Sequence, residues 1–438
     1  MPKTNKNVYP ESYVPLTATR QMLPASETSF MINLLAMAAA FVIIIAIKIA
    51  DLGWSTTLVL AVFAAVMSAV VWGLEYICYG KKSFAQKWMW RRKMSWSRVG
   101  FKLLGLACVF AVLAFGYWVL PVYKDQLFVT YLAVLRQIFW GLAVLSVPYF
   151  MLMDRIEERP ENAYWQLGRW LTGHHKDAHK PEMVELFRGW GVKFFYLALM
   201  MPYFSIRLDW FLKADFSRMF DYPYNIFYYC NELVFLVDLA FAATGYMMTF
   251  RLFNTQIRSS EPTVLGWLAA LACYWPFWAD IFGRYYFAYN TGVSWTKVFA
   301  GNEAMFMLWM GLILLCETIY SLATVALGLH FSNLTYRGLV SCGPYAYTKH
   351  PAYVFKNISW WLISMPFLVW SENPALAIKG SFLLLGLNGL YYLRAKTEEN
   401  HLSHYQEYVE YALAMNQKSI FAPVAKLLPF LKYKAPEK

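Results

Sequence analysis

The chain has 438 residues, of which 59% are hydrophobic, 19% aromatic and only 15% charged, and its mean hydropathy is +0.37. Soluble domains carry roughly 25% charged residues, so the composition excludes an ordinary soluble protein and indicates a polytopic membrane protein. The net charge of +12 does not require nucleic acid, because Lys and Arg gather in loops between apolar runs, where they meet the headgroups of anionic lipids. We therefore expect membrane lipids, and no nucleic acid, among its partners.

Apolar runs of about 20 residues, long enough to cross a bilayer as a helix, recur along the whole chain. Backbone groups in lipid must be satisfied within a span, and the alternation typical of barrel strands is not visible, so the prediction is an all-α fold with about ten transmembrane helices. In chain order the predicted spans are 30–50, 54–79, 99–119, 127–152, 190–212, 226–250, 264–282, 302–330, 352–370 and 374–393.

Lys and Arg divide unevenly between the two sets of loops that alternate along the chain. The loops 81–98 and 153–189 and the tail after 393 hold six or seven each, whereas the loops of the other set hold none to two each. Cytoplasmic loops carry the excess of positive charge, so both termini are predicted to face the cytoplasm. The first 29 residues are polar and show no cleavable signal peptide. Because no eukaryotic retention signal is visible, we expect a bacterial inner membrane.

Five acidic residues that lie inside predicted spans, between residues 75 and 317, are candidate functional residues. Each is a candidate for the proton or substrate site of a transporter, or else pairs with a nearby basic residue. They are Glu75, Glu232, Asp238, Asp280 and Glu317. No internal repeat is visible, which disfavours a secondary transporter.

A histidine-rich loop, TGHHKDAH, is a second candidate functional feature. It brings His174, His175 and His179 together, the last two at the i, i+4 spacing of metal ligands on a helix. Lys176 and Lys180 oppose a cation there, and no carboxylate pattern completes the set. We therefore predict a solvated loop and no metal site.

Polar residues fall at structured spacings after residue 300. The segment 330–353, HFSNLTYRGLVSCGPYAYTKHPAY, contains Gly338, which permits close backbone approach, and Pro344 and Pro351, which exclude one continuous helix. Irregular backbone beside a membrane is tolerated where it lines a cavity. Tyrosines supply stacking faces, and His350 can accept or donate a proton near neutral pH. The segment therefore predicts a binding site facing the cytoplasm.

A second polar stretch, RAKTEENHLSHYQEYVEYA at 394–412, follows the last predicted span. Arg394 and Glu398 are four residues apart and share one helix face, whereas the adjacent Glu399 must turn elsewhere. Leu402 and the tyrosines after it recur at helical spacing, which is typical of an amphipathic helix lying on the membrane surface, with Arg394 and Glu398 as an exposed ion pair. The alternative is that the stretch closes a pocket with the first polar segment.

The two segments together resemble a known family. GPYAYTKHPAY, two predicted spans and the pattern R-x3-E-E-x2-L-x5-Y-x2-Y are similar to the isoprenylcysteine carboxyl methyltransferase family and its bacterial and phospholipid-methylating relatives. The resemblance covers residues 302–420. Together with the predicted spans, it gives three regions: a cytosolic segment (1–29), a multi-span region of unknown role (30–300) and a methyltransferase-like region (301–438).

The resemblance implies S-adenosylmethionine as the cofactor, no metal, and in-line methyl transfer to a lipophilic acceptor from the bilayer. It implies that Glu398 holds the cofactor, that Arg394 faces the acceptor, and that Lys349 and Glu399 take part in catalysis. The further implied cofactor contacts are His330, Arg337, Gly338, Leu339, Val340, Tyr345, His350, Pro351, Ala352 and Tyr353. The sulfonium of such a cofactor favours carboxylate and aromatic faces, which these segments contain.

One position departs from the family pattern, because Lys349 stands where the family usually has Arg before His350 and Pro351. Lys keeps the charge but loses the planar fork, which leaves the acceptor open between a prenylcysteine carboxylate and a lipid amine or hydroxyl. Two other functions stay open. One is an NADPH-dependent membrane sterol or steroid reductase, whose comparable stretch has Asn before the tyrosine where this chain has Ala352. The other is a non-enzymatic transporter or scaffold that keeps the fold.

Overall fold

The computed structural model describes residues 23–79, 93–175, 179–368 and 373–436. In these ranges the regular structure is helical apart from one antiparallel pair of short strands, β1 (Ser259–Ser260) and β2 (Thr335–Tyr336), so the predicted all-α class is confirmed. The α-helices are α1 (Phe30–Ile49), α2 (Thr56–Tyr79), α3 (Trp96–Val119), α4 (Gln126–Ile156), α5 (Ala163–Leu171), α6 (Lys180–Lys213), α7 (Pro223–Met247), α8 (Val264–Leu271), α9 (Trp295–Val298), α10 (Glu303–Leu327), α11 (Pro351–Ser364), α12 (Pro374–Leu402), α13 (Gln406–Lys418) and α14 (Ala422–Leu427). Short 3-10 or π-helical segments are η2 (Pro121–Lys124), η4 (Phe216–Phe220), η5 (Arg251–Phe253), η6 (Phe277–Tyr286), η7 (Gly328–His330), η8 (Gly343–Ala346) and η9 (Pro429–Leu431). Most of the predicted N-terminal segment, much of the first basic loop and the middle of the histidine-rich loop lie outside the described residues.

Seven helices in the described part of the chain are long and apolar enough to cross a membrane. They are α1, α2, α3, α4, α7, α10 together with η7, and α12. Each falls on one of the spans predicted from the sequence. The prediction of about ten spans is therefore not confirmed in the described residues.

The remaining predicted spans take other forms. Helix α6 covers 190–212 and carries Lys193 and Arg207 there, and it is not among the seven. The span predicted for 264–282 is interrupted at Pro276 between α8 and η6, because proline has no backbone N–H for the helical ladder. Helix α11 replaces the ninth predicted span with 14 residues, about 21 Å of helix, which is too short for a hydrocarbon core of about 30 Å.

Capping residues and prolines fix where the helices near the site begin. The Asn373 side chain accepts hydrogen bonds from the first turn of α12, and Thr263 caps α8 in the same way. Pro351 occupies the first position of α11, where its missing N–H costs nothing. This placement fixes His350 directly at the N-terminal end of α11.

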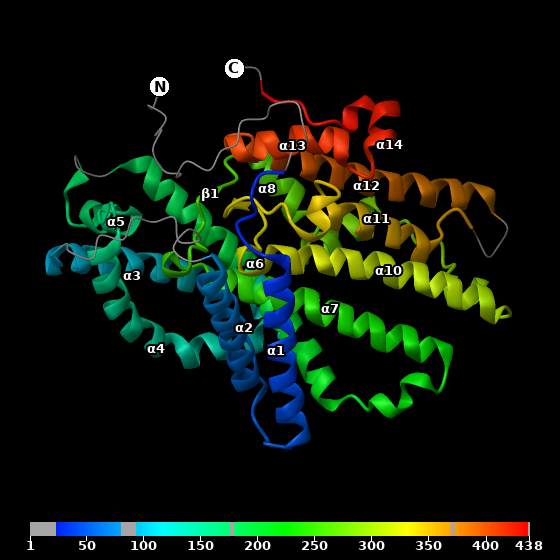
Figure 1. The fold of residues 1–438 in the computed structure, drawn as a ribbon, viewed down its shortest axis with the longest axis horizontal. Helices are drawn as coiled ribbons and strands as arrows, with labels where there is room; N and C mark the ends of the chain where they lie inside the picture. The colour runs from blue at the N-terminus through cyan, green and yellow to red at the C-terminus, as the bar shows by residue number, and fades with distance from the viewer. Residues whose placement is uncertain (1–22, 80–92, 176–178, 369–372, 437–438) are drawn as a thin grey trace.

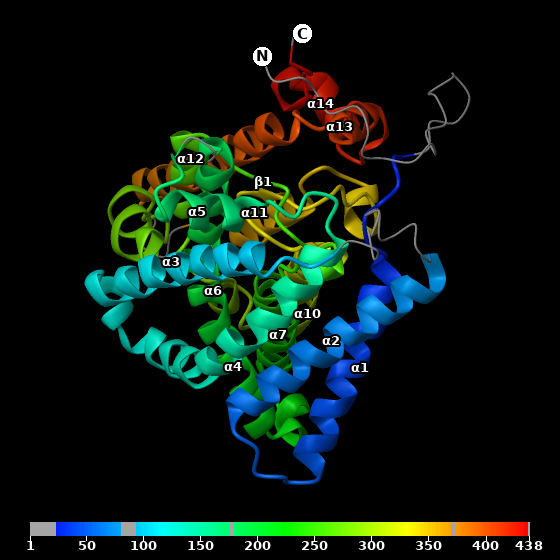
Figure 2. The same ribbon diagram turned by 90° about the vertical axis from the view of Figure 1, so that its left-hand side faces the viewer.

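Helices α13 and α14 lie at one end of the molecule, beyond α12, and the turn between α1 and α2 lies at the opposite end (Figures 1 and 2). The largest buried cluster joins α1, α2, α6 and α7 and includes Tyr196, Phe204 and Phe241. Two smaller clusters surround the C-terminal helices, one around Tyr391 of α12 and one around Tyr411 of α13. The C-terminal helices are therefore packed into the protein.

Helices α3 and α5 approach each other through a reciprocal pair of glycines. A Cβ atom on Gly105 of α3 would collide with the carbonyl oxygen of Tyr164, and one on Gly168 of α5 would collide with that of Phe101. Lipid provides no hydrophobic force between helices, so small residues that let backbones approach are a main source of helix association. The pair therefore fixes α5 against α3.

The regions before and after residue 300 are packed together. Strand β1 pairs with β2, with Ser259 opposite Tyr336. The backbone N–H of Glu27 donates to the carbonyl oxygen of Leu339 at 2.7 Å. Residues before position 301 therefore contact the polar segment 330–353 directly.

Candidate functional site

The first polar segment forms an irregular loop between α10 and α11. It contains only η7, β2 and η8, as its glycines and prolines predict. Gly338 has a φ of +114°, and a Cβ atom there would come within 2.7 Å of the Glu27 side chain. Backbone conformation and available space therefore both require glycine at this position.

Two small hollows adjoin where this loop meets α8, α10, α11 and α12. The Tyr320 hollow has a volume of about 80 Å³, and the Glu261 hollow has a volume of about 30 Å³. The Tyr320 hollow is lined by residues that include Tyr274, Tyr320, Thr324, Tyr345, His350 and Lys356. The Glu261 hollow is lined by residues that include Glu261, Gly266, Ala270, Thr335, Thr397 and His401. Both hollows are lined by Ser332, Asn333, Tyr353, Arg394 and Glu398.

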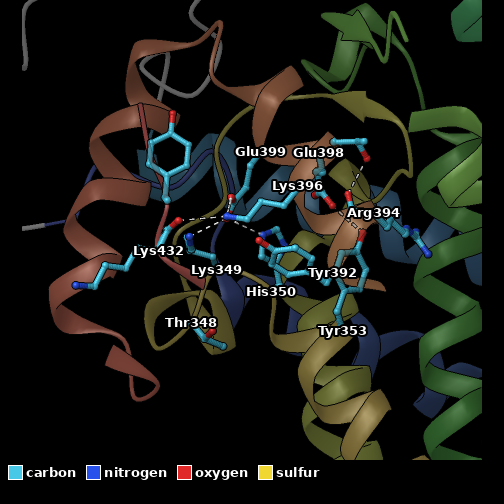
Figure 3. A network of polar contacts seen from close by, with 12 residues as sticks. Thr348, Lys349, His350, Tyr353, Tyr392, Arg394, Lys396, Glu398, Glu399 and Lys432 are labelled. Atoms are coloured by element: carbon cyan, nitrogen blue, oxygen red, sulfur yellow. Dashed lines mark hydrogen bonds and ion pairs between the residues drawn. The ribbon is translucent and has the colours of Figure 1, made fainter. Parts of the chain in front are cut away.

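Glu398 is held in place by the first turn of α11. The Tyr353 hydroxyl donates a hydrogen bond to Glu398 Oε2 at 2.7 Å. The His350 ring stacks on the Tyr353 ring, with centroids 5.4 Å apart and planes inclined by 5°. Figure 3 shows these side chains converging from α11 and α12. A carboxylate, a phenol and an imidazole are thereby fixed together on one wall of the Tyr320 hollow.

Arg394 lies one helical turn before Glu398, and only 6% of its surface is exposed. Its guanidinium lies 4.8 Å from the ring centroid of Tyr353 and 5.4 Å from that of Tyr274, and it donates to the side-chain oxygen of Asn333. In the described part of the chain it forms no ion pair with a carboxylate. The exposed pair with Glu398 expected from a surface helix is therefore wrong, because Arg394 is buried among aromatic rings.

Glu399 points away from the hollows and binds three basic side chains (Figure 3). Its carboxylate lies 2.7 Å from Lys349 Nζ, 2.7 Å from Lys396 Nζ and 3.2 Å from His350 Nε2. Burial lowers the pKa of Lys349, while the Glu399 carboxylate acts in the opposite direction. Lys349 and Glu399, the predicted catalytic residues, line neither hollow; their contacts hold His350 in position.

Helix α13 packs into the protein instead of resting on a membrane surface. Tyr408 and Tyr411 are 5% and 1% exposed and form a buried cluster with Leu339. The Tyr411 hydroxyl donates to the carbonyl oxygen of Tyr345 at 2.7 Å. The predicted helix also breaks between α12 and α13. The surface-helix interpretation is therefore wrong, because the tyrosine stripe is directed at the first polar segment.

The structure brings together only part of the predicted cofactor set. Residues that line a hollow are Tyr345, His350, Ala352, Tyr353 and Glu398. Residues that line neither are His330, Arg337, Gly338, Leu339, Val340 and Pro351. The Arg337 guanidinium donates to the backbone carbonyls of Thr255, Gly245 and Phe331 at 2.7 to 2.9 Å, and the Arg337 carbonyl oxygen lies 2.8 Å from His330 Nδ1. These contacts brace the loop that carries the site.

Several residues that line the hollows were not predicted. Tyr320 and Thr324 of α10 both donate hydrogen bonds to the buried carboxylate of Asp238, at 2.8 and 2.5 Å. Asp238 was singled out in the sequence as an acidic residue inside a span, and that signal points to this wall of the Tyr320 hollow. Tyr274 and Asn333 carry no comparable signal, since nothing in the sequence distinguishes Tyr274 from the other tyrosines.

No protein-family model, no curated protein and no solved structure matches this chain. The fold defines the class of the protein: it is all-α, and the described part of the chain contains seven helices able to cross a membrane. Its candidate site combines a positioned carboxylate, a buried guanidinium and several aromatic rings. Such a site suits a ligand that carries both positive and negative groups on an aromatic or apolar frame.

Proposed function

We propose that the protein is a membrane methyltransferase that uses S-adenosylmethionine and methylates a lipophilic acceptor from the bilayer. The cofactor supplies a methyl group activated by its positively charged sulfur. The proposed location is a bacterial inner membrane with the site on the cytoplasmic side, which the distribution of Lys and Arg supports.

The main support is the position of Glu398 beside Tyr353 in the Tyr320 hollow. A cationic ligand is stabilised by a nearby carboxylate and by aromatic faces, and the 2.7 Å contact with Tyr353 presents both together. Tyr345, His350 and Ala352 line the same hollow. These residues would hold the cofactor. They belong to the cofactor contacts implied by the family resemblance, and they line one hollow.

Arg394 supports an acceptor with an anionic group. A buried guanidinium without a carboxylate partner is costly, and a carboxylate or phosphate of the acceptor would supply the missing charge. Lys356, which lines the Tyr320 hollow and lies over the ring of Tyr320, adds a second positive charge. Arg394 would then orient the acceptor for attack on the methyl group, since holding reacting atoms in line supplies much of such a rate enhancement.

Binding requires the lining side chains to move apart. Ligand pockets have volumes of about 300 to 1,000 Å³, whereas the Tyr320 hollow has a volume of about 80 Å³. Side-chain rearrangement at binding sites is common, and the adjoining Glu261 hollow provides a direction in which the space can extend.

The test is calorimetric binding of S-adenosylmethionine and of NADPH to the purified full chain in detergent. We expect S-adenosylmethionine to bind, and Glu398→Gln to weaken it about 10- to 100-fold through loss of a charge-assisted contact. Glu410→Gln, which neutralises a carboxylate on α13 outside both hollows, is the matched control and should bind like the wild type. Arg394→Ala should keep cofactor affinity close to that of the wild type, because its proposed partner is the acceptor.

The outcomes separate the functions left open by the sequence. Binding of NADPH without S-adenosylmethionine would replace the proposal with a reductase. If the folded wild-type protein binds neither S-adenosylmethionine nor NADPH, a transporter or scaffold would be favoured. Equal S-adenosylmethionine affinity in the wild type and in Glu398→Gln would remove Glu398 from the cofactor site.

A further inference from the structure

A second cluster of chemically reactive side chains lies beside the Glu261 hollow. His401 follows Glu398 by one turn on α12 and lines this hollow. Its Nε2 atom lies 2.8 Å from the hydroxyl oxygen of Ser259 in β1. His401 is buried, with 6% of its surface exposed, whereas Ser259 is partly exposed. The sequence had singled out neither residue for a functional role.

The hydroxyl of Ser259 contacts both Tyr405 and His401. The Tyr405 hydroxyl donates to Ser259 Oγ at 2.7 Å. With a neutral His401 in the tautomer that carries its proton on Nδ1, Ser259 accepts from Tyr405 and donates its own single proton to His401 Nε2. The remaining proton of the imidazole is then on Nδ1. This is the polarity in which a histidine withdraws a proton from a serine nucleophile.

Glu261 supplies a third group on the far side of the imidazole. Its Oε2 atom lies 3.9 Å from His401 Nδ1, and its side chain is 3% exposed. Its Oε1 atom accepts a hydrogen bond from the backbone N–H of Thr263 at 2.9 Å, which holds the carboxylate beside the start of α8. The 3.9 Å separation is longer than a hydrogen bond, so in this arrangement Glu261 stabilises a positive charge on the imidazole through space. Shortening on substrate binding is common for such contacts.

We infer that Ser259, His401 and Glu261 form a nucleophilic site that cleaves a carboxylic ester carried by a lipophilic molecule. Ser259 Oγ forms a bond to the ester carbonyl carbon, the carbon–oxygen bond to the alcohol breaks, and the serine proton passes through His401 to the departing alkoxide. Water then releases the acid by the same route and restores the serine. Ser259 and His401 are the catalytic residues, and Glu261 is a positioning residue.

The lipophilic character of the ester follows from the surroundings of His401. His401 belongs to the last turn of α12, a helix able to cross a membrane, and Leu334, Leu402 and Ala270 give the otherwise polar Glu261 hollow an apolar part. Tyr405 donates its hydroxyl proton to Ser259 Oγ at 2.7 Å, which fixes the position of the attacking oxygen beside His401. This reaction differs in its chemistry from the proposed methyl transfer, although the two hollows share Ser332, Asn333, Tyr353, Arg394 and Glu398.

A fluorescent fluorophosphonate tests the inference without knowledge of the natural ester. Attack by Ser259 forms an oxygen–phosphorus bond and releases fluoride, while His401 takes the serine proton. We expect the purified full chain to be labelled, with the label mapped to Ser259 by peptide mass spectrometry. Ser259→Ala should abolish labelling, and Ser260→Ala should not, because the neighbouring Ser260 is buried with 2% of its surface exposed.

The base and the positioning residue are tested through the second-order rate constant of labelling. His401→Ala should slow labelling at least about 100-fold, as expected for loss of a general base, whereas His404→Ala should leave it unchanged. Glu261→Gln should slow labelling at least about tenfold at an unchanged Tm. If the three residues only tie β1 to α12, the wild type will not be labelled, and that result overturns the inference. Labelling that persists in Ser259→Ala overturns it equally. S-adenosylmethionine binding is measured on the same Ser259→Ala sample, and its loss or retention bears only on the methyltransferase proposal.

Discussion

Replacing Glu399 with Gln should destabilise the protein, because this carboxylate neutralises the basic cluster behind the site. Lys349 and Lys396 lie 2.7 Å from its two oxygens, and their side chains are 11% and 26% exposed. Removing one partner of a buried ion pair costs about 3 to 5 kcal/mol. We expect the lower end, about 3 kcal/mol, because Lys396 is partly hydrated and Lys349, whose pKa is lowered by burial, can lose its proton.

The assay is thermal unfolding in detergent, combined with a double-mutant cycle. With an unfolding entropy of roughly 2.1 cal/mol/K per residue over 438 residues, a loss of 3 kcal/mol corresponds to a fall of about 3 °C in Tm. Lys349→Gln should have a smaller effect, and the double variant Lys349→Gln with Glu399→Gln should recover at least about 1 kcal/mol of the loss, since the two residues interact directly. Glu410→Gln controls for the loss of one negative charge.

An unchanged Tm in Glu399→Gln, or losses in the two single variants that simply add, would refute the assignment of Glu399 to a structural ion cluster. If such a stable variant also bound S-adenosylmethionine normally but lost turnover, that result would support the catalytic role predicted from the sequence. The cycle therefore decides between the two roles for Lys349 and Glu399.

The other predictions concern packing and orientation. Gly168→Ala should lower the free energy of unfolding by about 1 to 3 kcal/mol, because the added Cβ atom would collide with the backbone of α3. Gly100→Ala is the control and should not lower it, because the space around Gly100 is open. Thermal unfolding measures both variants. Tyr411→Phe should lower the free energy of unfolding by about 1 kcal/mol, because the hydrogen bond to the loop is lost. The control is Tyr347→Phe, since the Tyr347 side chain is exposed. Equal stability of the two variants would show that α13 does not hold the loop in place. In a cysteine-free background, single cysteines at Tyr347 and at Asp51 should react with an impermeant maleimide from opposite sides of the membrane, Tyr347 from the cytoplasmic side. Labelling of Tyr347→Cys from outside would reverse the proposed orientation.

Local patterns in the sequence were sufficient for the fold class and for the irregular shape of the first polar segment; of the ten spans they predicted, seven coincide with long apolar helices in the described residues. Each depends on neighbouring residues. An apolar run of sufficient length must be helical in lipid, and Pro351 must begin a helix or end one. The same reasoning placed Arg394 and Glu398 on one face of α12 and turned Glu399 away, because helical periodicity separates adjacent side chains by about 100°.

The partners of these side chains depended on contacts between distant parts of the chain. Only the packed structure shows that Glu399 meets Lys349, that Glu398 meets Tyr353, and that Arg337 donates to backbone carbonyls instead of lining a hollow. The same applies to Ser259, which precedes His401 by 142 positions and lies within hydrogen-bond distance of it. Helical spacing determines the face on which a side chain lies, but the packing of helices and loops against that face decides what it touches.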